Sequence, residues 1–100
     1  MTVLIAIQEA IDISFHIVVD EGWGLPASYA EGFDLLAAHA LIDAETAKAL
    51  SGMAALRNRL AHGYASVDHE RLWGELPNGL VALERLVEAV ALFVESARQS

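Results

Sequence analysis

The sequence of 100 residues contains no cysteine, which excludes disulfide bonds and cysteine-ligated zinc. It also lacks an apolar run of about eighteen residues, the minimum for a membrane-spanning helix, because Glu84, Arg85 and Glu88 interrupt the best candidate. Residues 1–7 are apolar, but they are too few for a signal peptide and no basic segment accompanies them. We therefore expect a cytoplasmic protein with no membrane segment.

Basic residues are scarce, with six Lys and Arg against 14 Asp and Glu, for a net charge of −8. Because phosphate affinity comes mainly from Lys and Arg, this balance argues against a general nucleic-acid binder. The charges are unevenly spread, however. Residues 1–47 contain no Lys or Arg, whereas residues 46–67 contain no acid. This local reversal of charge matters more than the total, because the densest group of polar and reactive side chains lies within the acid-free window.

The length predicts one domain over residues 1–100, and no repeat or linker divides it. Hydrophobic residues make up 55% of the chain, above the roughly 45–50% usual for soluble domains. A chain this small has little interior in which to bury the excess. We therefore expect the protein to associate, most simply as a homodimer.

Apolar residues recur every three or four positions through residues 3–20, which predicts a first helix. Further apolar residues widen this stripe and predict a helix buried on two sides: Ile5, Ile13, Ile17 and Val19. Residues 27–41 form the expected second helix, with Ser28 and Glu31 as a capping box. Asp43 is the expected cap of a third helix that runs towards Ala61, with Gly63 just after its end.

A last helix is expected from His69 to about Ala97, starting after a cap at Asp68. Pro77 should kink or split it, because proline lacks the N–H and clashes with the preceding turn. Its apolar face is expected to comprise Leu80, Leu83, Leu86, Val87, Val90, Phe93 and Val94. The sequence thus predicts an all-α fold, a small antiparallel bundle of about four helices.

Residues 56–64 read Leu-Arg-Asn-Arg-Leu-Ala-His-Gly-Tyr and place a cation, an amide, an imidazole and a phenol close together. Asn58 and His62 are four residues apart and share a helix face. Arg57 and His62 are five apart, about 140° around the helix. They converge only if the helix loosens, if the arginine reaches over, or if both face a second copy of the chain across a two-fold axis.

Such a groove suits RNA cleavage without a metal. His62 can exchange a proton with a ribose hydroxyl or the leaving oxygen, and Arg57 can stabilise the charge of the transition state. Asn58 can orient either group, Tyr64 can stack on a base, and Arg59 can add a phosphate contact. No pair of acids flanks the segment and no two histidines have metal-ligand spacing, so we expect no metal and no cofactor.

Each of these residues also has a purely structural interpretation. Arg57 can be an interface ion-pair residue, and Arg59 can lie on a solvated face. His62 can interact with the dipole at the helix C-terminus, and Tyr64 can be half-buried packing. Only the combination of Arg57, Asn58, His62 and Tyr64 favours a functional site.

Arg57, Asn58, His62 and Tyr64 match the R-x4-H-x-Y motif, and the segment resembles HEPN-domain proteins, specifically the HepT-like toxins. Residues 28–33 and 52–58 are also similar to that family, and the resemblance covers about residues 3–95. It implies a homodimeric helical bundle with a ribonuclease site at the dimer interface, where Arg57 and His62 are catalytic and Asn58 supports them. Family members usually carry one more helix before the segment matched here, so the chain either starts inside the family's fold or is a shorter variant.

The resemblance also implies a partner, an MNT-type minimal nucleotidyltransferase antitoxin that transfers AMP to Tyr64. The main hypothesis is therefore a metal-independent endoribonuclease toxin of a toxin–antitoxin pair, with RNA as its substrate. The alternative is a non-catalytic module that binds a nucleotide or the nucleotidyltransferase. A third interpretation is a structural dimer in which the motif is only an interface network.

Overall fold

Four α-helices make up the computed structural model, which describes residues 3–62 and 69–99. They are α1 (Val3–Asp20), α2 (Tyr29–Ala38), α3 (Ala44–His62) and α4 (His69–Gln99). No strand occurs in either described segment, so the prediction of an all-α fold of about four helices is confirmed. None of the described helices is long and apolar enough to cross a membrane.

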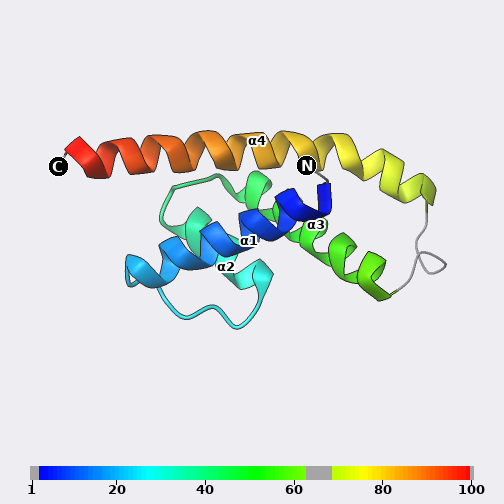
Figure 1. Cartoon of the computed structure of the whole chain (residues 1–100), viewed down its shortest axis with the longest axis horizontal. Coiled ribbons are helices and arrows are strands. Elements are labelled where there is room, and N and C mark those ends of the chain that lie inside the picture. Colours follow the sequence, from blue (N-terminus) through cyan, green and yellow to red (C-terminus); the bar gives the residue numbers. More distant parts are fainter. Residues whose placement is uncertain (1–2, 63–68, 100) are drawn as a thin grey trace.

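Helix α4 runs the length of the molecule, and the other three helices lie along one side of it (Figure 1). Its 31 residues correspond to about 46 Å at 1.5 Å per residue, close to the longest dimension of 49 Å. Helix α3 runs antiparallel to α4, and the C-terminal turns of α4 project beyond the other helices (Figure 1). Helix α3 makes its most extensive contacts with α2 and α4.

The predicted helix starts are confirmed. The Ser28 hydroxyl accepts a hydrogen bond from the Glu31 N–H at 3.1 Å and caps α2. The Asp43 carboxylate accepts one from the Thr46 N–H at 2.7 Å and caps α3. Each side chain thereby satisfies an N–H that has no partner inside the helix.

The prediction that the second helix extends to residue 41 is wrong, because α2 ends at Ala38. The chain turns at Ala40, which has a φ of 61°. The N–H of Leu41 donates to the Leu36 carbonyl and that of Ala40 to the Ala37 carbonyl, the paired bonds of a Schellman motif. Position 40 is usually glycine in this motif, so an alanine there gave no sign of a helix end.

Helix α1 is buried on one side only, which corrects the prediction of two buried sides. Ile7, Ile11 and Val18 are almost fully buried. Of the four residues expected to widen the stripe, Ile17 is buried, whereas Ile5, Ile13 and Val19 are exposed. Helix α1 contacts α2, α3 and α4, and its buried residues recur at spacings of three and four, which places them on one side of the helix. The predicted apolar stripe of this helix therefore has the correct helical period but covers more of the helix circumference than is buried.

Helix α4 continues through Pro77 as one element, so of the two outcomes predicted for Pro77, a kink or a split, the split is wrong. Its expected apolar face is also divided. Leu83 and Leu86 are buried against the other helices, whereas Leu80, Val87 and Val94 are exposed. Those three are seven residues apart, and they lie at one edge of the same helical stripe as Leu83, which is four residues from Val87.

The connection between α1 and α2 is anchored by an aromatic stack. Trp23 lies parallel to His39, the C-cap of α2, with ring centroids 4.3 Å apart and planes 4° apart. The edge contact of Trp23 with Phe93 of α4 fixes this loop against the long helix. The core itself centres on Phe33, Leu36 and Leu50.

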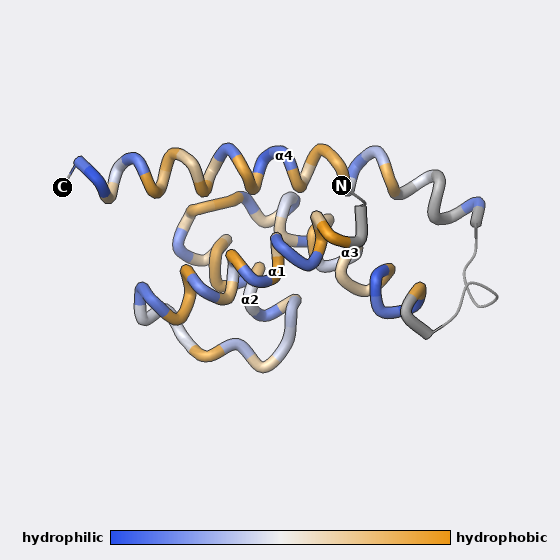
Figure 2. The backbone as a smooth tube through the Cα atoms, in the orientation of Figure 1, coloured by the Kyte–Doolittle hydropathy of each residue, from blue (hydrophilic) through white to orange (hydrophobic). Residues whose placement is uncertain are grey.

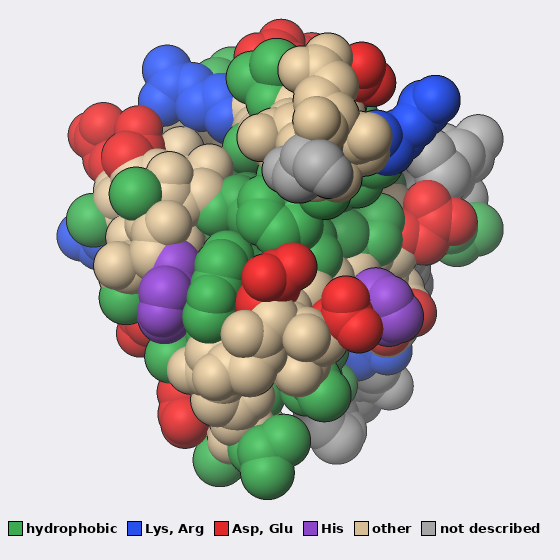
Figure 3. Space-filling model, turned by 90° about the vertical axis from the view of Figure 1, so that its left-hand side faces the viewer, with side chains coloured by type: hydrophobic (Ala, Val, Ile, Leu, Met, Phe, Trp, Pro, Cys, Tyr) green, Lys and Arg blue, Asp and Glu red, His purple; other side chains and the backbone are tan. Residues whose placement is uncertain are grey.

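Large apolar side chains nevertheless remain on the surface. Leu25, Leu92 and Val87 are 82%, 73% and 66% exposed. Figure 3, which views the end of the molecule that holds the α4 C-terminus, shows apolar side chains at the surface between acidic ones. This exposed apolar area agrees with the high hydrophobic fraction of the composition, and association remains a prediction.

Candidate functional site

Arg57 and Asn58 meet on the last turns of α3. The Arg57 guanidinium Nη1 donates a hydrogen bond to the Asn58 amide Oδ1 at 3.2 Å. Arg57 is half-buried, whereas Asn58 and Arg59 are exposed. The structure thus brings together two of the residues that the sequence assigned to the site, and it places the amide as an acceptor that restrains the guanidinium.

The amphipathic pattern of α3 explains this placement. Leu50, Met53, Ala54 and Leu56 are buried at spacings of three, one and two, and they fix which side of the helix faces the core. Arg57 lies seven residues after Leu50, two helical turns on, and so continues this buried side towards the end of α3, whereas Asn58 and Arg59 lie about 100° and 200° further round. Figure 2 shows a hydrophilic band there, near the C-terminal end of α3.

His62 is the last residue of α3, and its side chain lies outside the part that the structure describes. Gly63 and Tyr64 are also outside the described residues, as is the predicted cap Asp68. The backbone of α3 does remain helical to His62. Helical geometry therefore keeps the backbone directions of Arg57 and His62 about 140° apart, without the loosening that would turn the two residues toward each other.

The Arg57 guanidinium is free of acidic partners among the described side chains. The two salt bridges between described residues involve other arginines, Arg85 with Asp43 and Arg98 with Glu95. Residues 46–67 contain no acid, so no carboxylate close in sequence neutralises Arg57. A guanidinium in this state can bind a phosphate through two parallel N–H donors.

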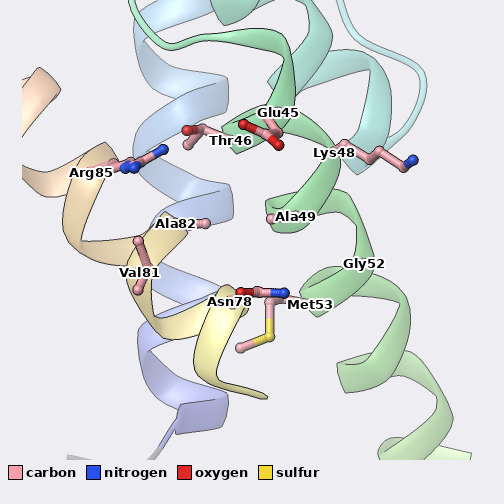
Figure 4. A pocket seen from close by; sticks show the side chains of 11 residues that line it. Glu45, Thr46, Lys48, Ala49, Gly52, Met53, Asn78, Val81, Ala82 and Arg85 are labelled. Atoms are coloured by element: carbon pink, nitrogen blue, oxygen red, sulfur yellow. The ribbon is translucent and has the colours of Figure 1, made fainter. Parts of the chain in front are cut away.

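A groove that the sequence reasoning missed lies between α3 and α4 (Figure 4). Its volume is about 570 Å³, within the range of small-molecule sites. The residues that line each wall recur at steps of three and four, and this spacing was the signal by which the sequence could have revealed the groove. They are Glu45, Lys48, Ala49 and Gly52 on α3, and Asn78, Val81, Ala82 and Arg85 on α4.

The charged groups of this groove gather at one end. Arg85 and Glu45 extend over that end from opposite walls, whereas the Lys48 ammonium points away from the groove (Figure 4). Hydrogen bonds from Thr46 hold the pKa of the neighbouring Asp43 carboxyl below its usual value. Among the described residues, no group of three or more acids and histidines is arranged to hold a metal ion.

Comparison with models of known protein families gives a match. The model of the family described as "Ribonuclease HepT-like" matches residues 1–90, which is most of the chain and includes residues 56–64. No curated protein and no solved structure matches the chain.

Proposed function

Because the chain belongs to the HepT-like ribonuclease family, we propose that it is a metal-independent endoribonuclease that acts as the toxin of a toxin–antitoxin pair. The observation that carries the proposal is the half-buried Arg57, oriented by Asn58 and without a carboxylate partner among the described side chains. This arrangement is suited to a phosphodiester, since a fixed guanidinium stabilises the charge that develops on phosphorus oxygens.

The proposed reaction uses the ribose of the RNA as its own nucleophile. His62 removes the proton from the 2′-hydroxyl, and the 2′-oxygen forms a bond to the adjacent phosphorus. The bond from phosphorus to the 5′-oxygen breaks, and this oxygen takes up a proton from a second imidazole. The products are a 2′,3′-cyclic phosphate and a 5′-hydroxyl, with Arg57 stabilising the extra negative charge between them.

A dimer supplies the second imidazole. A regular helix separates Arg57 and His62 by about 140°, so we propose that a two-fold axis places two copies of the motif in one cleft. The exposed apolar residues of α1 and α4 support association. Light scattering should give twice the 10.8 kDa of one chain, and a monomeric mass would contradict the composite site.

Regulation is proposed to act on Tyr64, through AMP transfer by an MNT-type nucleotidyltransferase antitoxin. A phosphate attached two residues from His62 would compete for the Arg57 guanidinium and block the RNA phosphate. Incubation with the nucleotidyltransferase and ATP should add one or more AMP units to the intact mass, and Tyr64→Phe should prevent the addition.

The decisive experiment is RNA cleavage in the presence of EDTA by the wild type, Arg57→Ala and His62→Ala. We expect cleavage by the wild type alone, with cyclic-phosphate ends on the products. Equal cleavage by all three would overturn the assignment of the site. If none of them cleaves and the intact mass shows no modification, the alternative of a non-catalytic nucleotide-binding or protein-interaction module is favoured.

A further inference from the structure

Gly52 is the feature of the α3–α4 groove that packing does not explain. A glycine inside a helix is destabilising relative to alanine, and at Gly79 the reason is plain because Met53 occupies the space of a side chain. A Cβ at Gly52 would meet no other atom within 4 Å. Gly52 instead leaves the α3 backbone open along the groove, where a ligand can approach it closely.

Arg85 faces Gly52's helix from the opposite wall. Its guanidinium extends towards α3 (Figure 4) and lies 3.9 Å from Asp43 Oδ2. The other Asp43 oxygen caps α3, so the carboxylate is fixed and orients the arginine. The arginine side chain is 56% exposed, which leaves N–H donors available for a phosphate.

The groove leads towards the proposed catalytic residues. Ala49 and Met53 line it, and they are followed at the same four-residue step by Arg57, so the three share a helix face. Arg57 lies about 6 Å further along the axis than Met53. A strand that lies in the groove would therefore reach the Arg57 guanidinium.

We infer that the α3–α4 groove holds the RNA strand beside the scissile phosphate, with Arg85 on a backbone phosphate and Asn78 at a base edge. The base would lie on the small residues of the groove, since Gly52, Ala49 and Ala82 leave room for a ring. The Asn78 amide can both donate to and accept from a base. This inference rests on the proposed function, because it takes RNA to be the ligand.

Glu45 provides a test of whether the ligand of the groove is negatively charged. Its carboxylate lies at the same end of the groove as Arg85 (Figure 4) and should repel an RNA phosphate. Glu45→Gln is therefore expected to strengthen RNA binding, whereas Arg85→Gln should weaken it. A groove that binds a neutral or cationic ligand would not give this pair of opposite effects.

The experiment is fluorescence anisotropy with a labelled 2′-O-methyl RNA of about 12 nucleotides, whose blocked 2′-oxygen cannot act as nucleophile. Arg85→Gln should weaken binding about five- to tenfold at ~50 mM salt and lower the salt slope by about 0.7, the value for one phosphate contact to a single strand. The matched control is Arg98→Gln, because Arg98 is also exposed and lies 3.9 Å from a carboxylate on α4. It should bind like the wild type.

A second variant separates ligand binding from folding. Gly52→Leu should fill the groove and reduce RNA affinity at least tenfold, while the melting temperature stays the same or rises, because leucine is the better helix former. Arg85→Gln and Gly52→Leu that both bind like Arg98→Gln would overturn the inference even if the wild type cleaves RNA. The opposite outcome is also informative. If both variants weaken RNA binding as expected but the wild type cleaves no RNA, the nuclease proposal is overturned and the groove remains an RNA-binding site. Absence of RNA binding by the wild type would overturn the inference.

Discussion

Gly79 of α4 and Met53 of α3 are complementary, because the methionine side chain occupies the space that a Cβ at position 79 would need. That Cβ would overlap the Met53 Sδ and lie 2.7 Å from its Cγ. Met53 is 3% exposed, so the surrounding core restricts its movement. The contact sets how closely α3 and α4 approach at the end of the groove next to Arg57.

Gly79→Ala is therefore expected to lower the free energy of unfolding by about 1 kcal/mol. Overpacking costs roughly 1–3 kcal/mol, and the better helix propensity of alanine offsets about 1 kcal/mol of it. Gly52→Ala is the matched control, since open space surrounds that position, and it should raise stability by up to about 1 kcal/mol. Urea denaturation of both variants tests this, and an equal gain in both would contradict the close contact.

Pro77 lies inside α4, and replacing it should stabilise the protein. Pro77→Ala restores an N–H and removes a ring that crowds the preceding turn, for an expected gain of about 1–3 kcal/mol. Pro26→Ala, in the loop before α2, should give no gain because it only increases the freedom of the unfolded chain. Thermal unfolding compares the two. A loss of stability in Pro77→Ala would mean that the proline supports a bend on which the packing depends.

Asp43 should make stability depend on pH. Hydrogen bonds from Thr46 and the charge of Arg85 lower its folded-state pKa. Its charged form therefore stabilises the fold above the unfolded pKa, about 3.9, and this contribution is lost as the pH falls through the lowered folded value. Asp43→Asn keeps an acceptor for the Thr46 N–H but does not titrate. The stability difference between wild type and Asp43→Asn should thus stay constant above about pH 5 and shrink as the pH falls further, through the unfolded pKa and then the lowered folded pKa.

Asn58 should affect catalysis through Arg57. Asn58→Ala removes the acceptor at 3.2 Å, so the guanidinium is less well placed, and kcat for RNA cleavage should fall about tenfold with little change in KM. Arg59→Ala, one residue further on, should instead raise KM and reduce the salt dependence of binding. Single-turnover cleavage measures both. An Asn58→Ala enzyme with normal kcat and raised KM would show that Asn58 binds substrate and does not position Arg57.

The helix starts were predictable because the determinants are local. Ser28 and Asp43 each cap a helix through an N–H three residues away, and such contacts are encoded within one turn. The end of α2 was not predictable in the same way, since Ala40 adopts a left-handed conformation for which alanine has no preference. The sequence also did not decide whether Pro77 splits the last helix, and the structure places it inside α4.

The candidate site also has features that the sequence determined and others that depend on the tertiary structure. The sequence alone determined which residues are available. Arg57, Asn58 and His62 lie in an acid-free segment, and the four-residue spacing of Asn58 and His62 places them on one face of a helix. Only the tertiary structure decided that Arg57 donates to Asn58, that α3 and α4 leave a groove beside this segment, and that Arg85 and Glu45 face each other across it. The last two relations join α3 to α4, with Glu45 and Arg85 forty positions apart. They depend on the packing angle of the two helices, which many side chains set at once.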